Sequence, residues 1–100
     1  VKFSDEVSVI RKQIIRSATS VAANYRAVCR ARSERERFSK MCIVVEETDE
    51  TAFWLELIEE LGMLPNAKVE EFKSETEEIL KVMSSYKKKL AKTLQITHHP

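Results

Sequence analysis

The sequence predicts a single all-α domain, and three observations lead to this fold class. The chain has 100 residues, which is enough for one domain with a buried core. It holds one glycine and two prolines against 43% apolar and 33% charged residues, too few turn residues for a sheet or barrel. Three long segments carry apolar residues at spacings of three and four, the period of a helix with one buried face. Residues 1–100 are therefore predicted to form one helical-bundle domain, and all-β and Rossmann-type folds are excluded.

The first predicted helix covers residues 5 to 31. Ser4 is a candidate N-cap, and Asp5 and Glu6 follow in the first turn, where the positive end of the helix dipole favours acids. The apolar face consists of Val7, Ile10, Ile14, Ala18, Val21, Tyr25 and Val28. We expect the helix to break between Ala31 and Ser33.

The second predicted helix covers residues 34 to 61. Ser33 and Glu36 have the spacing of a capping box, in which a hydroxyl and a carboxylate satisfy free N–H groups at a helix start. Gly62, the single glycine, stands where a left-handed residue ends a helix.

This second helix has two apolar faces instead of one. At 100° per residue, one face holds Phe38, Met41, Cys42, Val45, Thr48 and Ala52. The roughly opposite face holds Ile43, Trp54, Leu57, Ile58 and Leu61. Two faces need two partners, so the second face is a candidate oligomer interface. The alternative is that it packs against a fourth helix of the same subunit.

The third predicted helix covers residues 67 to 94. Pro65 prevents the second helix from continuing, and Asn66 is predicted to cap the third. An alternating seam typical of a bundle follows, consisting of Val69, Phe72, Thr76, Ile79, Met83, Tyr86 and Leu90.

Charge is segregated along the chain although the net charge is only +1. The segment from Arg11 to Lys40 contains nine basic and two acidic residues, whereas residues 41–67 contain seven acidic residues and no basic one. The basic block supplies candidate nucleic-acid contacts: Arg26, Arg30, Arg32, Arg35, Arg37 and Lys40. The alternative is that these residues neutralise the acidic second helix or cap the C-terminus of the first.

The sequence offers no convincing catalytic or metal site. Glu46, Glu47, Asp49 and Glu50 are close together, but a di-metal bundle needs Glu-x-x-His pairs, and His98 and His99 stand at the very end. We expect no metal, no cofactor and no enzymatic activity. Asp49 is instead predicted to be a structural polar residue on the core side, paired with Arg16 or Asn24 of the first helix. Cys29 and Cys42 are expected to be small buried hydrophobes.

Four ordered blocks of the sequence resemble a known family. They are Arg16–Arg26 (RSATSVAANYR), Arg30–Ser33 (RARS), Glu46–Thr51 (EETDET) and Trp54–Leu57 (WLEL). Together they are similar to the bacterial four helix bundle proteins. These are related to the proteins encoded in intervening sequences of 23S ribosomal RNA genes and to the accessory variability determinant of diversity-generating retroelements.

The chain departs from that family pattern at four positions. Ala18 and Ala22 stand where glycines are common, Ala27 stands where an acid is usual, and Arg37 stands where a large apolar residue is usual. Glycines would let a neighbouring helix approach closely, so the resemblance does not imply such a close approach at the two alanines. We expect Phe38 to make the apolar contact that the residue at position 37 makes in the family.

The resemblance implies a fold, an assembly and a set of partners. The fold is an up-down four-helix bundle whose first helix is largely absent from this chain, and the assembly is a homopentamer. Retroelement relatives bind a reverse transcriptase and nucleic acid. We therefore expect a non-enzymatic oligomeric scaffold. The alternative is an accessory module that binds RNA or DNA, and with it a reverse transcriptase, through the basic patch. No apolar run approaches the roughly 18 residues of a membrane span, so no membrane partner and a cytoplasmic location are expected.

Overall fold

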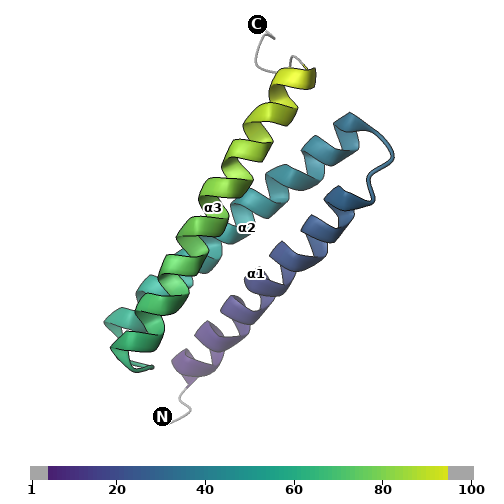
Figure 1. Ribbon diagram of the computed structural model, residues 1–100. Coiled ribbons are helices and arrows are strands. Elements are labelled where there is room, and N and C mark those ends of the chain that lie inside the picture. Colours follow the sequence, from purple (N-terminus) through teal and green to yellow (C-terminus); the bar gives the residue numbers. More distant parts are fainter. Residues whose placement is uncertain (1–4, 95–100) are drawn as a thin grey trace, which may run out of the picture.

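The computed structural model describes residues 5–94, which form three helices in an up-down arrangement (Figure 1). The helices are α1 (Asp5–Cys29), α2 (Glu34–Glu60) and α3 (Asn66–Leu94), with no strand in the described part of the chain. Each boundary lies within two residues of its predicted position, so the all-α fold class is confirmed. The candidate cap Ser4 and the histidines His98 and His99 lie outside the described residues.

The turn between α1 and α2 is held by the predicted capping residues. The Ser33 hydroxyl accepts from the Glu36 backbone N–H at 3.0 Å, as a capping box requires. The Glu36 carboxylate reaches back to the N–H of Arg32 at 2.7 Å, one residue earlier than the motif prescribes. Since both bonds satisfy N–H groups that have no helical partner, they fix where α2 begins.

The turn between α2 and α3 is a Schellman motif built on the single glycine. Gly62 has φ +63°, its N–H donates to Glu59, and the N–H of Met63 donates to Ile58 at 3.2 Å. The Pro65 carbonyl then accepts the first α3 bonds, from Lys68 and Val69. Asn66 is therefore the first helical residue, and its predicted role as the cap is wrong, because the helix already begins at the proline carbonyl.

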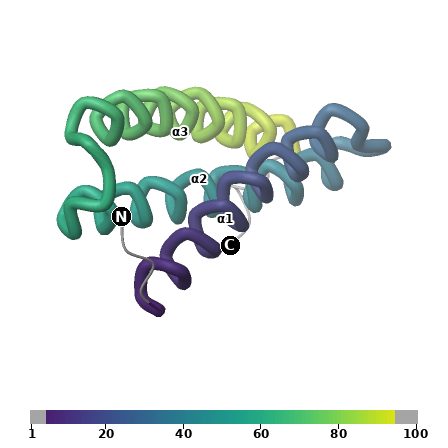
Figure 2. The backbone as a smooth tube through the Cα atoms, turned by 90° about the horizontal axis from the view of Figure 1, so that it is seen from below, coloured from purple at the N-terminus to yellow at the C-terminus, as the bar shows by residue number. Residues whose placement is uncertain are grey.

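The central helix is α2, and the other two both pack along it. No Cα of α1 lies within 8 Å of a Cα of α3 in the described residues. Figure 2 shows α3 above α2 and α1 crossing α2 at an angle, so α1 and α3 are farthest apart near the N-terminal end of α1. The molecule is thus an open layer of helices, not a closed bundle.

The core consists of two apolar clusters spaced along α2. One contains Val28, Met41, Val44 and Leu90, and the other contains Ile10, Ile58 and Val69. Each cluster draws side chains from all three helices, so the clusters fix both outer helices on α2.

Small hydroxyl residues separate the two clusters. Ser17 and Thr48 are almost fully buried, and Thr76 is nearly so. The Thr48 hydroxyl donates to the Val44 carbonyl at 2.7 Å, and Thr51 donates to the Ser17 oxygen at 2.9 Å. The buried side-chain N and O atoms of the described residues all have partners, so this polar zone carries no unpaired group.

Two expectations about burial need correction. Phe72 and Ile79 of the predicted α3 seam are 40% and 42% exposed, because they line the open space between α1 and α3. Cys29 is exposed and not buried, because it points about 100° away from its buried neighbour Val28 on α1. Cys42 is half-buried.

Candidate interaction surfaces

The most extensive candidate surface is the groove between α1 and α3, which we call the α1–α3 groove. Its floor is α2. Large apolar side chains along it are 39% to 56% exposed: Tyr25, Leu64, Phe72, Ile79 and Val82. Contiguous apolar exposure of this kind is uncommon on a monomeric protein and marks a binding surface.

The chemistry of the α1–α3 groove changes along its length. Its apolar end is a pocket of about 390 Å³ lined by Val7, Arg11, Ile14, Leu55, Ile58, Met63, Leu64 and Phe72. Its waist is a pocket of only about 150 Å³ between Ala18, Val21, Thr48, Thr51, Thr76 and Ile79. Its polar end is shallow, with Tyr25, Lys81, Val82, Tyr86 and Lys89 beside Glu78.

Two tyrosines and a cysteine mark the polar end of the groove. A hydrogen bond to Cys29 raises the pKa of Tyr25, and the nearby Tyr86 adds to this effect. Cys29 follows Tyr25 by one helical turn, so its exposed side chain lies on the same face of α1 as Tyr25.

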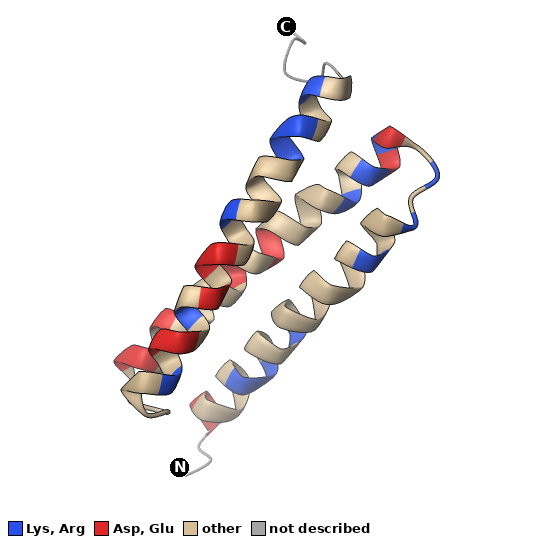
Figure 3. Ribbon diagram, viewed as in Figure 1, with Lys and Arg blue, Asp and Glu red and all other residues tan. Residues whose placement is uncertain are grey.

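The second candidate surface is a basic pocket at the turn between α1 and α2. Arg26, Arg30, Arg32 and Lys40 surround a shallow depression of about 380 Å³ that also includes Glu36. Ala23 and Ala27 of α1 also line it. Within the described residues no ion pair to these four cations is seen, so they are not used to neutralise the acidic part of α2. Figure 3 shows the basic residues gathered around this turn.

Two of the six predicted nucleic-acid contacts lie elsewhere. Arg37 pairs with Glu34, and its guanidinium also reaches the carbonyls of Val28 and Ala31, each at 3.4 Å. It therefore caps the C-terminus of α1, which was the alternative role of the basic block. Arg35 is exposed but does not line the basic pocket.

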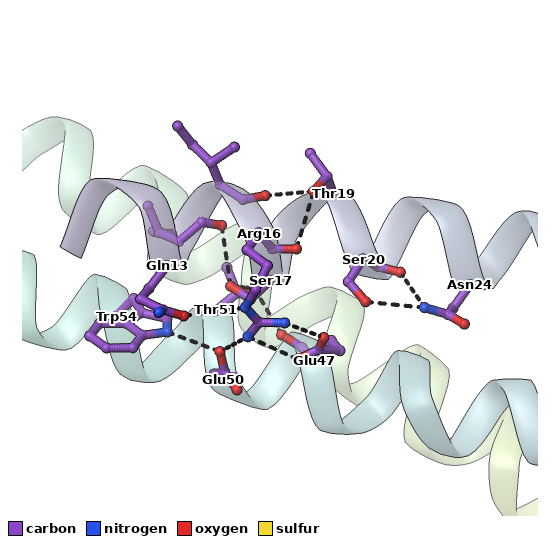
Figure 4. A network of polar contacts seen from close by, with 12 residues as sticks. Gln13, Arg16, Ser17, Thr19, Ser20, Asn24, Glu47, Glu50, Thr51 and Trp54 are labelled. Atoms are coloured by element: carbon purple, nitrogen blue, oxygen red, sulfur yellow. Dashed lines mark hydrogen bonds and ion pairs between the residues drawn. The ribbon is translucent and has the colours of Figure 1, made fainter. Parts of the chain in front are cut away.

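The third feature is a polar network on the side of α1 away from the groove (Figure 4). Arg16 bonds to Glu47 at 2.8 Å and to Glu50, and its Nε donates to Gln13 at 3.2 Å. The Trp54 indole N–H donates to the Glu50 carboxylate at 3.2 Å. We call these residues the Arg16 network. They tie α1 to α2 on one side only.

The pKa directions in the Arg16 network follow from these bonds. The hydrogen bond from Arg16 lowers the pKa of Glu47 although partial burial opposes the shift. The same bond raises the pKa of Arg16. The ion pair is therefore charged at neutral pH and holds the two helices together electrostatically.

The predicted role of Asp49 is wrong. Asp49 is exposed, whereas Arg16 pairs with Glu47 and Glu50 and the Asn24 amide donates to Ser20. Asp49 is two residues from Glu47, which turns its side chain about 200° around α2 and away from α1. Arg16 itself is a cross-helix polar residue, as predicted, but with other partners.

The predicted oligomer face on α2 is only partly free. Ile58 is 5% exposed and belongs to the core, because α1 and α3 both reach it. Trp54 and Leu57 pack against that same cluster and are half-buried, and Ile43 is also half-buried. Leu61 is exposed, and so is Phe53, whose ring meets Trp54 edge-on with centroids 4.9 Å apart.

Sequence reasoning missed Phe53, Glu47 and Glu50 as functional or cross-helix residues. The uninterrupted apolar run from Ala52 to Leu55 was a signal for Phe53, because a surface helix rarely has four consecutive apolar residues. The spacing of three between the two glutamates was a signal for a shared partner on the next helix.

Two properties of residues 5–94 bear on chemistry. No group of three or more metal-ligating side chains is found among residues 5–94. None of α1, α2 and α3 is both long and apolar enough to cross a membrane.

Comparison with known proteins places the chain in a family. No curated protein matches it significantly. A crystal structure of a protein of unknown function from the S23 ribosomal protein family of Bacteroides thetaiotaomicron is 35% identical. The match covers 80% of this chain and 74% of that one, with a TM-score of 0.77. The model of the 23S rRNA-intervening sequence protein family matches residues 2–85. Since this match spans most of the chain and the solved relative shares its fold, the protein belongs to the 23S rRNA-intervening sequence protein family.

Proposed function

We propose that this protein is a non-enzymatic assembly module whose α1–α3 groove accepts a fourth helix. The observation that supports this function is the line of exposed apolar side chains between two helices whose Cα atoms are all more than 8 Å apart. A helix in the groove would bury them and complete an up-down four-helix bundle. Each square ångström of apolar surface removed from water contributes about 25 cal/mol, so covering the groove is favourable.

A binding experiment with a matched pair of variants tests this groove function. The probe is a fluorescein-labelled amphipathic 18-residue peptide, titrated with protein and followed by anisotropy. Phe72→Glu should abolish binding, because it places a charge on the apolar end of the groove. Ser74→Glu adds the same charge on another side of α3 and should bind like wild type. Equal binding by both variants would contradict the proposal.

We also propose that the module self-associates through the outer side of α2. Phe53 and Leu61 are 52% and 55% exposed there and continue the half-buried side chains of Ile43, Trp54 and Leu57. Obligate interfaces are built from such apolar surfaces. The family resemblance favours five subunits, which gives the expected mass.

Light scattering at micromolar concentration tests the self-association. Phe53→Glu and Leu61→Glu should each reduce the measured mass while the helical circular dichroism stays unchanged, because both side chains are exposed. Val82→Glu, exposed in the groove, is the matched control and should keep the oligomer. A wild-type monomer would contradict this part of the proposal.

A second candidate function is binding of nucleic acid at the basic pocket. The observation that favours it is the gathering of Arg26, Arg30, Arg32 and Lys40 around one depression without ion-pair partners in the described chain. Guanidinium groups suit the geometry of phosphate oxygens. No exposed aromatic ring lines this pocket, so contacts would be to the backbone and nearly indifferent to sequence.

Salt dependence of RNA and DNA binding tests this second function. Four phosphate contacts predict a slope of log K against log salt of roughly −3, at about −0.7 to −0.9 per contact. The double variant Arg30→Glu/Arg32→Glu should abolish binding. Lys88→Glu/Lys89→Glu reverses the same number of charges on α3 and should bind nearly as wild type. No binding by wild type at low salt, or loss only in the lysine variant, would contradict it.

A further inference from the structure

We infer that the basic pocket at the turn between α1 and α2 binds the end of a nucleic-acid strand, through a terminal phosphate monoester, and not the interior of a strand. This inference rests on the second proposed function, binding of nucleic acid at this pocket. It adds which part of the nucleic acid is recognised.

The basic pocket lies on the side of α1 opposite to the α1–α3 groove. Ala23 and Ala27 line the pocket, whereas Tyr25 lines the groove. Each alanine is two residues from Tyr25, which is about 200° around the helix. Whatever covers the groove therefore leaves this pocket unchanged.

The charge of the pocket favours a dianion. Arg26 and Arg30 come from α1, and Arg32 comes from the turn. Lys40 comes from α2, and Glu36 is the carboxylate among them, which leaves an excess of three positive charges around a depression of about 380 Å³. A phosphodiester inside a strand carries one negative charge, whereas a phosphate monoester carries about −1.5 to −2 at pH 7 and offers three strong acceptor oxygens. A terminal phosphate therefore matches this pocket better than an internal one.

The carboxylate of Glu36 is already engaged by the backbone. It accepts from the N–H of Arg32 at 2.7 Å, in the turn that leads into α2. Its negative charge also lies in the first turn of α2, where the positive end of the helix dipole compensates it in part. Glu36 thus shapes the turn, and the four cations remain available to a ligand.

The cations of the pocket differ in depth. Lys40 is half-buried, whereas Arg26, Arg30 and Arg32 are exposed. A terminal phosphate in the depression would contact the Lys40 ammonium, and the guanidinium groups at the rim would reach its oxygens and the next phosphates of the strand.

Acidic residues prevent a strand from continuing along the two helices. Residues 41–67 contain seven acids and no base, and Figure 3 shows the acids gathered farther along α2. Glu47 follows Lys40 by two helical turns and lies on the same face. Arg16 is already paired with Glu47 and with Glu50. A strand that ran along the α1–α2 contact would meet these carboxylates, so it should end in the pocket and leave toward solvent.

Two RNAs with the same number of phosphates test the preference for an end. One has about 12 nucleotides and a 5′-phosphate, and the other is one nucleotide longer with a 5′-hydroxyl, a length typical of single-strand sites. Both carry fluorescein at the 3′ end and are titrated with protein at low salt, followed by anisotropy. The 5′-phosphorylated RNA should bind on the order of tenfold more tightly, because its extra charge meets more than one cation.

The pH dependence of this preference identifies the dianion. The second ionisation of a phosphate monoester has a pKa of about 6. The ratio of the two affinities should therefore fall severalfold between about pH 7.5 and about pH 5, where the monoester carries a single charge like a diester. The charged groups that face the ligand, Arg26, Arg30, Arg32, Glu36 and Lys40, are common to both measurements, so the ratio reports the phosphate.

A matched pair of variants places the terminal phosphate in the pocket. Lys40→Gln should remove most of the preference for the 5′-phosphate, because it takes away the half-buried cation. Arg35→Gln removes the same charge from an exposed residue of the same turn that does not line the pocket, and it should keep the preference. Circular dichroism and urea midpoints of both variants should match wild type.

Competition distinguishes a strand end from a small phosphorylated molecule. Uridine 5′-monophosphate carries the same monoester without neighbouring phosphates, so its displacement of the phosphorylated RNA should need on the order of 100-fold higher concentration than the RNA itself. Displacement at equal concentration would assign the pocket to small phosphate esters and would overturn the inference.

The remaining outcomes separate this inference from the function on which it rests. Equal affinity for the two RNAs, or a preference that does not change with pH, overturns the recognition of a strand end and leaves nucleic-acid binding standing. A preference lost in Arg35→Gln and kept in Lys40→Gln overturns its placement in the pocket. If neither RNA binds at low salt, both proposals fail.

Discussion

The two sides of α1 meet their surroundings in opposite ways. On one side the Arg16 network connects α1 to α2. A hydrogen bond of 2.9 Å between Ser17 and Thr51 adds a second polar link between the same two helices. On the other side α1 faces α3 across the α1–α3 groove, where Tyr25, Ile79 and Val82 stay 39% to 56% exposed. One helix is therefore sealed by specific polar bonds on one side and left open and apolar on the other.

This difference shows which contacts of α1 are completed within this chain and which are left open. Hydrogen bonds and ion pairs between α1 and α2 set the position of one helix on the other, because they need defined geometry. Apolar side chains in the groove specify only that something apolar should cover them. The side of α1 with the Arg16 network thus stabilises the fold of this chain, whereas the side facing the α1–α3 groove is available for interactions.

The largest expected effect comes from the core that both sides share. Met41 is fully buried, so Met41→Ala should lower the free energy of unfolding by about 2–5 kcal/mol through lost contacts and a cavity. Val82→Ala in the groove should change it by less than about 0.5 kcal/mol, because that side chain is 56% exposed. Urea unfolding followed by circular dichroism measures both. Similar losses in the two variants would show that the groove is already closed.

A smaller effect is expected at the hydroxyl contact between Ser17 of α1 and Thr51 of α2. Thr51→Val should cost about 1 kcal/mol, since it removes a hydroxyl whose single proton lies within hydrogen-bond distance of the Ser17 oxygen and the Glu47 carbonyl. Thr93→Val, on the exposed end of α3, removes only a local bond to Lys89 and is the control. Thermal unfolding of both variants compares them, and an unchanged Thr51→Val protein would mean that the hydroxyl contact does not hold α1.

The Arg16 network predicts a modest pH dependence of stability. The pKa of Glu47 is lower in the folded state than its ordinary value of 4.5, so the unfolded state takes up the proton first. The stabilisation is complete above that ordinary value and is lost as the pH falls through the lower folded-state pKa. Urea midpoints across the acid range should therefore fall less steeply for Glu47→Gln than for wild type. Parallel curves would show that the ion pair contributes nothing.

The smallest effect on stability is expected in the groove itself. Ile79→Ser should leave the urea midpoint nearly unchanged, because Ile79 is 42% exposed and serine is about as good a helix former as isoleucine. It should still reduce the fluorescence of the dye ANS, which binds exposed apolar surface. A large stability loss together with unchanged dye fluorescence would place Ile79 in the core instead.

Local sequence signals determined the helices and their turns. Ser33 with Glu36, Gly62 and Pro65 act within a few residues of themselves, so their effects do not depend on the rest of the fold. The helical period located part of the buried core of α1 and α2 for the same reason, but it missed Ser17, Val44 and Leu55. The charge blocks likewise located the basic pocket, since four of its six predicted residues are neighbours across one turn.

Only the tertiary structure decided which partner each side chain meets. Helical periodicity tells which residues share a face but not which neighbour covers it, so Ile58 proved to be core and Asp49 proved to be exposed. It could not show that Arg37 turns back to α1, or that Arg16 chooses Glu47 and Glu50. The groove has the same origin. Phe72 and Ile79 follow the seam of a packed helix, and they stay exposed because α3 docks on α2 alone. Sequence spacing determines a helix because its bonds are local, whereas the placement of helices depends on contacts between residues far apart in the chain.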